Sequence, residues 1–121
     1  MADCIRTLAV RGAPAIGIAA AYGLALAGHD RAAAAELLRS TRPTAVNLGW
    51  ALHQVLAADS PLERARELHA HQHEADLRLA ELGAERFAPG DRALTHCNAG
   101  ALATAGYGTA GGVLRSAWEA G

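Results

Sequence analysis

Apolar residues recur at helical spacing along most of the chain, and short groups of proline, glycine and polar residues interrupt them. Pro14 suits the first turn of a helix and Gly28 suits its end. Asp30 is a good cap for a second helix, and Pro43 separates that helix from a third, because the residue before a proline is pushed out of the helical region. The pattern therefore predicts helices over residues 14–27, 31–39 and 44–57, after an irregular start.

The second half of the chain begins with a longer and more polar helix. Ser60, Pro61 and Glu63 form a capping box with proline at the first helical position, and the helix is expected to end at about Ala84. Pro89-Gly90-Asp91 then predicts a turn, followed by a short strand over residues 92–96. Residues 98–121 are expected to be helical again, with a break near 106–108.

A series of helices followed by a single strand and a helix is not a complete fold, because a lone strand cannot form a sheet. Residues 92–121 are therefore interpreted as the first strand-helix unit of an α/β domain whose other strands are absent. The chain is expected to end within that domain.

Composition adds that the core will be thin. The chain has 121 residues, of which 51% are apolar and 19% charged, which is typical of a globular protein. Alanine supplies 31 residues and aromatics only 4%, and alanine buries little area. We therefore expect a piece of something larger. The net charge of −1 gives no electrostatic basis for binding nucleic acid or an anionic membrane.

Cysteine use favours a reducing cytoplasm. Cys4 and Cys97 are too few and too far apart for a disulfide scaffold or a zinc knuckle. The apolar stretch 13–27 follows two arginines and resembles a signal peptide, but Pro14 and two glycines interrupt it, so secretion is disfavoured. A membrane span is less favoured still, since the stretch falls short of the roughly 20 residues that a bilayer requires.

Cys97 lies at the predicted turn from strand to helix, where open α/β sheets collect ligands. Backbone N–H groups at such a turn stabilise negative charge, either a bound phosphate or a cysteine thiolate. A buried structural cysteine is the alternative, because free cysteine is among the most buried residue types.

Two arginines precede two predicted helix starts. Arg11 and Gly12 come just before Pro14, and Arg42 comes just before Pro43. Both guanidinium groups could bind one phosphate through forked hydrogen bonds, assisted by the helix dipoles. Solvated surface arginine is the alternative for each.

Two further patterns favour structural roles. Gly106-Tyr-Gly-Thr-Ala-Gly111 matches a dinucleotide-binding spacing, but it does not directly follow a strand, so it is interpreted as close packing. His69, His71 and His73 could suggest a metal site, yet only the first and third share a helix face and no cysteine or carboxylate set completes a site. A solvated helix is the preferred interpretation, and no metal is predicted.

Three long segments, in this order, resemble the successive motifs of the methylthioribose-1-phosphate isomerase family. That family is related to the regulatory subunits of the guanine-nucleotide exchange factor of eukaryotic translation initiation. The resemblance implies a mixed α/β fold, incomplete at both ends: a mostly helical part over residues 1–89, then the start of a Rossmann-like catalytic domain over 90–121. The matching segments are VRGAPAIG (10–17) with AAYG (20–23), TRPTAVNL (41–48), and LTHCNAGALAT (94–104) with Gly108-Thr109.

The resemblance implies conversion of 5-methylthioribose 1-phosphate to 5-methylthioribulose 1-phosphate in methionine salvage, with no metal or organic cofactor. It implies substrate-binding roles for Arg11, Gly12, Ala13 and Arg42, and a catalytic role for Cys97 beside the reacting carbons. The implied partners are a phosphorylated sugar and a second copy in the family's homodimer. Proton transfer through an enediol-like species and hydride transfer both fit these residue types.

The family's longer chain also carries a catalytic aspartate, a substrate-binding glutamine and an Asn-Lys pair beyond the matching motifs. We therefore expect little or no isomerase activity from the 121 residues alone. Three alternatives stay open: a ribose-1,5-bisphosphate isomerase, a non-catalytic relative that acts like the exchange-factor subunits through protein contacts, and a fragment with no independent function.

Overall fold

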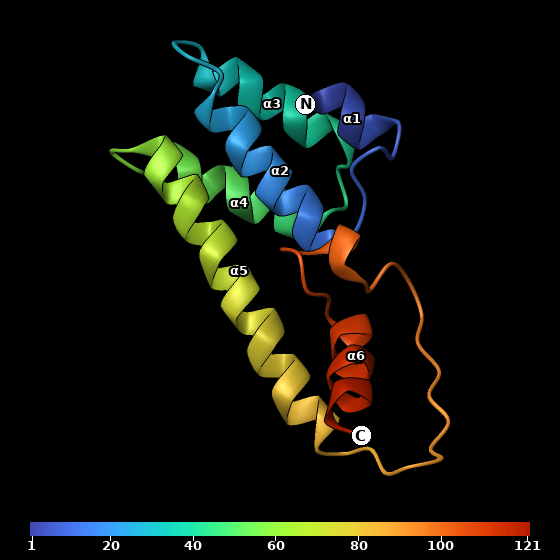
Figure 1. Ribbon diagram of the computed structural model, residues 1–121. Coiled ribbons are helices and arrows are strands. Elements are labelled where there is room, and N and C mark those ends of the chain that lie inside the picture. The colour runs from blue at the N-terminus through green and yellow to red at the C-terminus, as the bar shows by residue number, and fades with distance from the viewer.

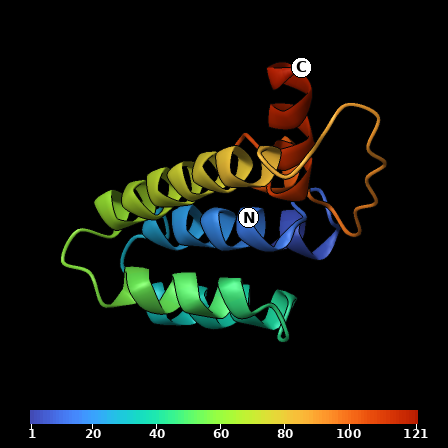
Figure 2. The same ribbon diagram turned by 90° about the horizontal axis from the view of Figure 1, so that it is seen from below.

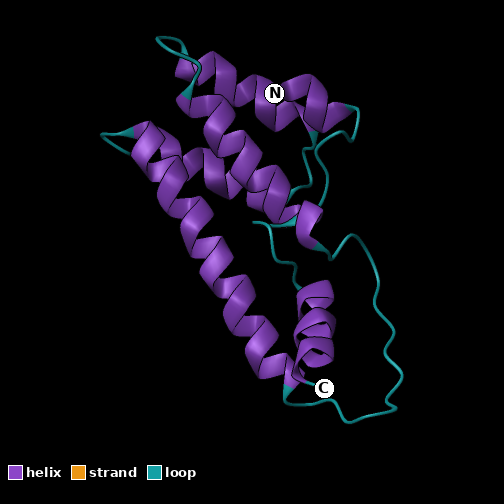
Figure 3. Cartoon of the chain, in the orientation of Figure 1, coloured by secondary structure: helices purple, strands orange, loops and turns teal.

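The computed structural model describes all 121 residues as six α-helices and one short 3-10 helix, with no β-strand (Figures 1 and 3). All four helices predicted before residue 90 are present, and a short helix occupies part of the start that was expected to be irregular. None of the helices is both long and apolar enough to cross a bilayer. The elements are α1 (Ala2–Arg6), α2 (Ala13–Ala25), α3 (Arg31–Thr41), α4 (Val46–Leu56), α5 (Pro61–Ala84), the 3-10 helix η1 (Ala101–Ala103) and α6 (Ala110–Ala120).

Helix α2 lies between α5 on one side and α3 and α4 on the other (Figure 2). Helices α2 and α4 run in the same direction and begin at the same end of the molecule, whereas α5 runs the opposite way (Figure 1). The contact between α2 and α4 depends on glycine, because a Cβ built at Gly17 would lie 3.0 Å from the carbonyl oxygen of Asn47. Small residues in α2 therefore let its neighbours approach closely.

The apolar core lies among α1 to α4 and the first half of α5. Five of its thirteen buried residues are alanine, which confirms the expectation of a thin core. Each fully buried Leu, Ile or Val side chain contributes about 1.5–3 kcal/mol, so the branched residues supply most of the stabilisation. The thirteen are Ile5, Ile16, Ala20, Ala21, Leu24, Ala35, Leu38, Leu48, Ala51, Leu52, Val55, Ala65 and Leu68.

The predicted helix caps are partly confirmed. The Asp30 carboxylate accepts a hydrogen bond from the backbone N–H of Ala33 at 3.1 Å, as expected for the cap of α3. Pro61 occupies the first position of α5, but the Ser60 side chain makes no capping hydrogen bond. Glu63 instead pairs with Arg66 one turn along the helix. The capping box was therefore wrong in its side chains, although the helix start was right.

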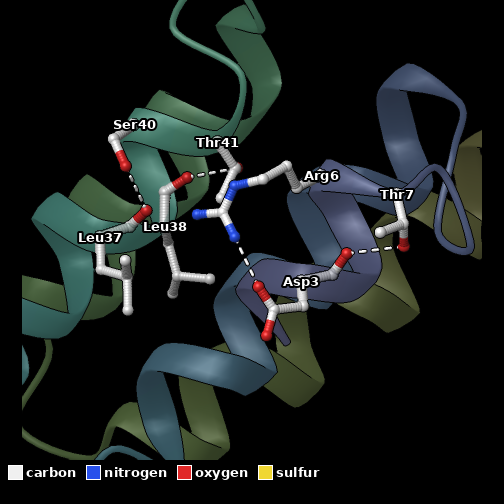
Figure 4. A network of polar contacts seen from close by, with 7 residues as sticks. All are labelled: Asp3, Arg6, Thr7, Leu37, Leu38, Ser40 and Thr41. Carbon is white, nitrogen blue, oxygen red and sulfur yellow. Dashed lines mark hydrogen bonds and ion pairs between the residues drawn. The ribbon is translucent and has the colours of Figure 1, made fainter.

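Near the end of helix α3, side-chain hydroxyl groups donate hydrogen bonds to backbone carbonyl oxygens of its last turns. Ser40 Oγ donates to the carbonyl oxygen of Leu37 at 2.8 Å, and Thr41 Oγ1 donates to that of Leu38 at 2.6 Å (Figure 4). Such bonds compete with continuation of the helix. Arg42, which precedes proline, adopts a non-helical conformation with φ of −146°. The chain thus turns towards α4 at the position predicted from Pro43.

The strand predicted over residues 92–96 is not formed, so the strand-helix unit expected in 90–121 is only partly present. The turn before it is confirmed, since the Asp91 side chain accepts a hydrogen bond from the N–H of Ala88 at 2.8 Å. Residues 92–98 are exposed and make no backbone hydrogen bond. A strand is stabilised by pairing, and no second strand exists here to supply partners. The segment is therefore an extended loop.

The last part of the chain returns to the helical body. Helix α6 packs beside the end of α5, where a Cβ at Gly83 would lie 2.5 Å from a methyl group of Val113. Of the helix predicted over 98–121, only the short η1 and α6, which begins at Ala110, are formed. The predicted break near 106–108 is present, with φ values of 108° and 112° at Gly106 and Gly108. This fold brings the loop that contains Cys97 against the start of α2.

Candidate functional site

Arg11 and Cys97, which are far apart in sequence, line one cavity at the start of α2. The cavity has a volume of about 440 Å³, and we call it the Cys97 cavity. Both side chains are exposed to solvent, so a dissolved ligand can reach them. The remaining lining residues come from one continuous segment, Asn98, Ala99, Gly100, Ala101, Leu102 and Ala103.

Gly12 is the residue that allows this closeness. Its φ of 97° lies in the region that favours glycine, and a Cβ at this position would lie 2.4 Å from the carbonyl oxygen of Ala103. The backbone of residues 11–12 can therefore rest against η1 without a side chain in between. Ala13 follows as the first residue of α2 and is exposed. Arg11 thus lines the Cys97 cavity, while Gly12 holds the start of α2 against Ala103 at its edge.

Cys97 has an unusual backbone conformation, with φ of 72°. A non-glycine residue with positive φ costs roughly 1–3 kcal/mol and persists only where its surroundings hold it. Its side chain is exposed, so the alternative of a buried structural cysteine is wrong. The turn presents the thiol to solvent rather than to the core.

The segment after Cys97 is held by hydrogen bonds to the glycine-rich segment that follows. The carbonyl oxygen of Ala99 accepts the N–H groups of Thr109 at 3.0 Å and Gly111 at 3.1 Å. Gly100 and Gly108 form an isolated antiparallel bridge. A Cβ at Gly111 would lie 2.8 Å from the Ala99 oxygen. These contacts confirm the close-packing interpretation of the segment 106–111.

Helix α2 begins beside η1, and α4 begins against the first turns of α2, where Gly17 approaches Asn47, so their unpaired N–H groups and positive dipole ends lie close together (Figure 1). Arg42, which is half-buried, stands just before α4 but lines a different cavity, of about 280 Å³, together with Arg39 and Trp50. The structure therefore brings Arg11, Gly12 and Cys97 together. Arg42 is placed at the neighbouring helix start, outside the Cys97 cavity.

Two of the three histidines on α5 make specific contacts rather than being solvated. His69 Nδ1 lies 3.2 Å from the Tyr22 hydroxyl, and His73 Nδ1 lies 3.1 Å from the carbonyl oxygen of Ala105. They share a helix face as predicted, while His71 is exposed. His69 and His73 therefore have different partners.

Sequence reasoning missed Asp76 altogether. This α5 residue is 1% exposed, and its carboxylate accepts a hydrogen bond from the N–H of Ala105 at 3.4 Å. A signal was available, because Ala65, Leu68, Asp76 and Ala80 follow one another at helical spacing on the buried stripe of α5. An acidic residue within such a stripe indicates a buried polar contact.

The one ion pair with shifted titration lies on α6. Arg115 Nε donates to Glu119 Oε1 at 2.8 Å. This hydrogen bond, together with the positive charge, holds the pKa of Glu119 below its ordinary value, against a smaller opposing effect of burial. The same pair raises the pKa of Arg115. Both residues stand outside the Cys97 cavity, on a solvent-exposed helix face.

Comparison with known proteins identifies relatives for nearly the whole chain. The sequence profile described as "Initiation factor 2 subunit family" matches residues 9–121. The chain is 52% identical over 139 aligned residues to the methylthioribose-1-phosphate isomerase of Alkalilimnicola ehrlichii, with 98% of this chain covered. It spans about 40% of the length of that curated relative.

Two solved structures share the arrangement of elements. The 5-methylthioribose 1-phosphate isomerase from Pyrococcus horikoshii is similar with a TM-score of 0.80 and 38% identity, over 94% of this chain and 39% of that one. The translation initiation factor eIF-2B, subunit delta, from A. fulgidus is similar with a TM-score of 0.74 and 43% identity. That match covers 98% of this chain and 42% of the other. Both neighbours are therefore considerably longer than the described chain.

Proposed function

The chain belongs to the initiation factor 2 subunit family, and from this premise we propose that it supplies the phosphate-binding and cysteine-bearing part of a cytoplasmic methylthioribose-1-phosphate isomerase. The observation that carries the proposal is the meeting of Arg11 and Cys97 in one solvent-accessible cavity at the start of α2. The level of identity to the A. ehrlichii isomerase supports the choice of substrate.

The reaction needs a held phosphate and a group that moves protons. In an aldose 1-phosphate the anomeric oxygen carries the phosphate, so the ring cannot open as a free hemiacetal would. The bond between C1 and the ring oxygen must break, with a proton going to that oxygen. The hydrogen of C2 ends on C1, and the C2 hydroxyl becomes a carbonyl. Atoms and electrons balance within the substrate, so the reaction consumes no oxidant or reductant.

Arg11 and the first N–H groups of α2 suit the phosphate. A guanidinium binds phosphate through two parallel hydrogen bonds, and the positive end of a helix adds to the attraction. Arg42 and the start of α4 form a second cationic region at the same end of the molecule. In this proposal Arg42 reaches the substrate together with Arg11, and the phosphate lies between the two helix starts.

Cys97 suits the reacting carbons. Its thiol lines the same cavity as Arg11, and we propose that a substrate whose phosphate is bound at the start of α2 places C1 and C2 beside Sγ. We assign Cys97 one half of the acid/base pair. The other half is a carboxylate supplied by the part of the fold that corresponds to the remaining length of the relatives.

We also propose that residues 90–121 begin a Rossmann-like domain, with the boundary at residue 89. The extended segment 92–96 carries the apolar residues Ala93 and Leu94, is exposed and has no backbone partners, as expected of a strand that lacks its sheet. In a homodimeric enzyme of this family the segment would pair with neighbouring strands of the Rossmann-like sheet.

The test joins residues 1–121 to the part of the A. ehrlichii relative that follows the matched region. The fusion is expected to convert 5-methylthioribose 1-phosphate to the ketose, and NMR of the sugar carbons measures this conversion. The 121 residues alone are expected to show little turnover. Cys97→Ser is expected to lower kcat by about 10²–10⁴-fold, the usual contribution of a general acid or base. Cys4→Ser, at the other exposed cysteine, is the matched control and should leave kcat unchanged.

The same assay separates the alternatives. A folded fusion that turns over ribose 1,5-bisphosphate and leaves the methylthio sugar unchanged would replace the proposed substrate. A folded fusion inactive on both would favour the non-catalytic alternative, for which the similarity to the eIF-2B delta subunit is the supporting observation. Full activity of Cys97→Ser would contradict the role given to the thiol.

A further inference from the structure

We propose that Asp76 and His73 of α5 are positioning residues that hold the Cys97 turn through the backbone of Ala105. The inference rests on the proposed function for its catalytic meaning, whereas its structural content can be measured without any turnover. Neither residue lines the Cys97 cavity, so both act through the loop that follows it.

The buried carboxylate of Asp76 is the first part of this arrangement. Gln72 Nε2 donates to one of its oxygens at 2.8 Å, and the N–H of Ala105 donates to the other at 3.4 Å. Asp76 is 1% exposed and has no salt-bridge partner. A buried acidic group costs free energy unless hydrogen bonds satisfy it, so the burial of Asp76 on the core-facing stripe of α5 requires partners that compensate for this cost. Contact with the Ala105 amide supplies one.

His73 binds the other polar group of the same residue. Its Nδ1 lies 3.1 Å from the carbonyl oxygen of Ala105. A carbonyl oxygen only accepts, so Nδ1 carries the hydrogen and donates. One turn of α5 therefore binds both the N–H and the C=O of a single loop residue. Such two-sided recognition fixes the position and the direction of the backbone at Ala105.

From Ala105 the constraint continues through hydrogen bonds to Ala99, two residues from the cysteine. The neighbouring Thr104 is buried, and its Oγ1 accepts the N–H of Gly108 at 3.0 Å. Gly108 is bridged to Gly100, and the carbonyl of Ala99 is held by two N–H groups of the segment after Gly108. Ala99 is two residues from Cys97. Fixing Ala105 thus fixes the segment that begins two residues after Cys97.

Apolar burial does not replace this network. Of the residues between Cys97 and Ala105, only Ala103, Thr104 and Ala105 are buried, and Leu102 is 96% exposed. The segment has no large buried side chain. Its conformation therefore depends on Asp76 and His73 together with the contact between Gly12 and Ala103.

The experiment measures amide hydrogen exchange by NMR and the rate of Cys97 alkylation by iodoacetamide in the 121-residue chain with Cys4→Ser. Asp76→Leu removes the acceptor and is expected to speed exchange at Ala105, Gly108, Thr109 and Gly111 by about tenfold or more relative to α2. In this variant the rate of Cys97 alkylation is expected to approach the rate measured for the chain unfolded in urea. Asp76→Asn keeps an acceptor oxygen and should stay within about threefold of the wild type.

The controls make each outcome decisive. Val55→Ala removes buried methyl groups from α4, away from the loop, and should speed exchange throughout without favouring these four amides. If Asp76→Leu loses its helical circular dichroism, His73→Leu takes its place, since that half-buried side chain removes only the bond to the Ala105 oxygen.

The proposal is overturned if these variants leave Gly108 to Gly111 and Cys97 as in the wild type. It is also overturned if Val55→Ala gives the same pattern, or if wild-type Cys97 already reacts like the unfolded chain. Neither amide exchange nor the alkylation rate depends on turnover. An inactive fusion would therefore contradict the proposed isomerase function without affecting the role given to Asp76 and His73.

Discussion

The helical core and the Cys97 loop are stabilised by different interactions. The core, from α1 to the first half of α5, buries Leu, Ile and Val side chains such as Leu24, Leu48 and Leu52 completely. The loop after Cys97 buries only small or polar residues, and it is fixed by hydrogen bonds and by glycine contacts with no room for a Cβ. Burial of apolar surface stabilises the core, whereas hydrogen bonds and close backbone contacts at glycine stabilise the loop.

This difference matters for function because the two kinds of stabilisation fail in different ways. Apolar burial is non-directional, so a core can lose a methyl group and keep its shape at a cost in free energy. A hydrogen-bonded loop loses its conformation when one donor or acceptor is removed. A reactive cysteine needs a fixed conformation, and the loop supplies it where the small residues of this chain leave little apolar surface to bury.

The largest effect on stability is expected from Leu52→Ala in the core. Leu52 is fully buried, and truncation of a buried leucine costs about 2–5 kcal/mol of the free energy of unfolding. Urea denaturation followed by circular dichroism measures the loss. Leu102→Ala, at a leucine that is 96% exposed on η1, is the control and should stay within about 0.5 kcal/mol. Equal losses in the two variants would erase the distinction between core and loop.

An intermediate effect is expected from Gly12→Ala at the junction of the two regions. The new Cβ would meet Ala103 and the backbone has φ of 97°, so we expect a cost of about 1–3 kcal/mol together with faster amide exchange in η1. Gly28→Ala is the matched control, because Gly28 also has positive φ, 67°, but nothing lies within 4 Å of its added Cβ. Similar η1 exchange in both variants would show that the contact with Ala103 is unimportant.

The smallest effect is expected at the ion pair of α6, which serves neither region. The hydrogen bond from Arg115 lowers the pKa of Glu119, so the pair stabilises the fold above the ordinary glutamate pKa of 4.5. This contribution disappears as the pH falls through the lower folded value. NMR titration of the Glu119 carboxyl carbon should give a midpoint below 4.5 that rises in Arg115→Gln. An unchanged midpoint would mean that the pair does not form in solution.

Local signals were enough to predict the helices. Pro14, Asp30 and Pro61 act on backbone geometry within a few residues of themselves, and each marks a helix start that the structure contains. Ser60 misled because a side-chain cap competes with other partners, and Glu63 pairs with Arg66 instead. The strand at 92–96 misled for a stronger reason. A short segment after a turn describes what a sheet would accept, whereas a strand forms only where partners exist.

The sequence was enough to identify candidate site residues, but not to predict how they are arranged in space. The segments around Arg11 and Cys97 were identified from their motifs, and the structure places both in one cavity. Nothing local indicates that Gly12 contacts Ala103, or that Arg42 lines a different cavity, because both facts depend on how distant helices pack. The burial of Asp76 could be predicted from its place on the stripe of α5, but its partner could not, since a backbone amide 29 residues away leaves no trace in a sequence pattern.

The glycine at position 17 acts as a spacer that sets the distance between two positive charges. Helices pack 8–10 Å apart depending on the side chains between them. With no side chain at Gly17, the backbone of α2 rests against the Asn47 carbonyl at the beginning of α4. The two helix starts, each preceded by an arginine, are therefore held as near to each other as helical backbones allow. The alanine and glycine content that makes this core weak per residue also brings the two positive helix ends close together.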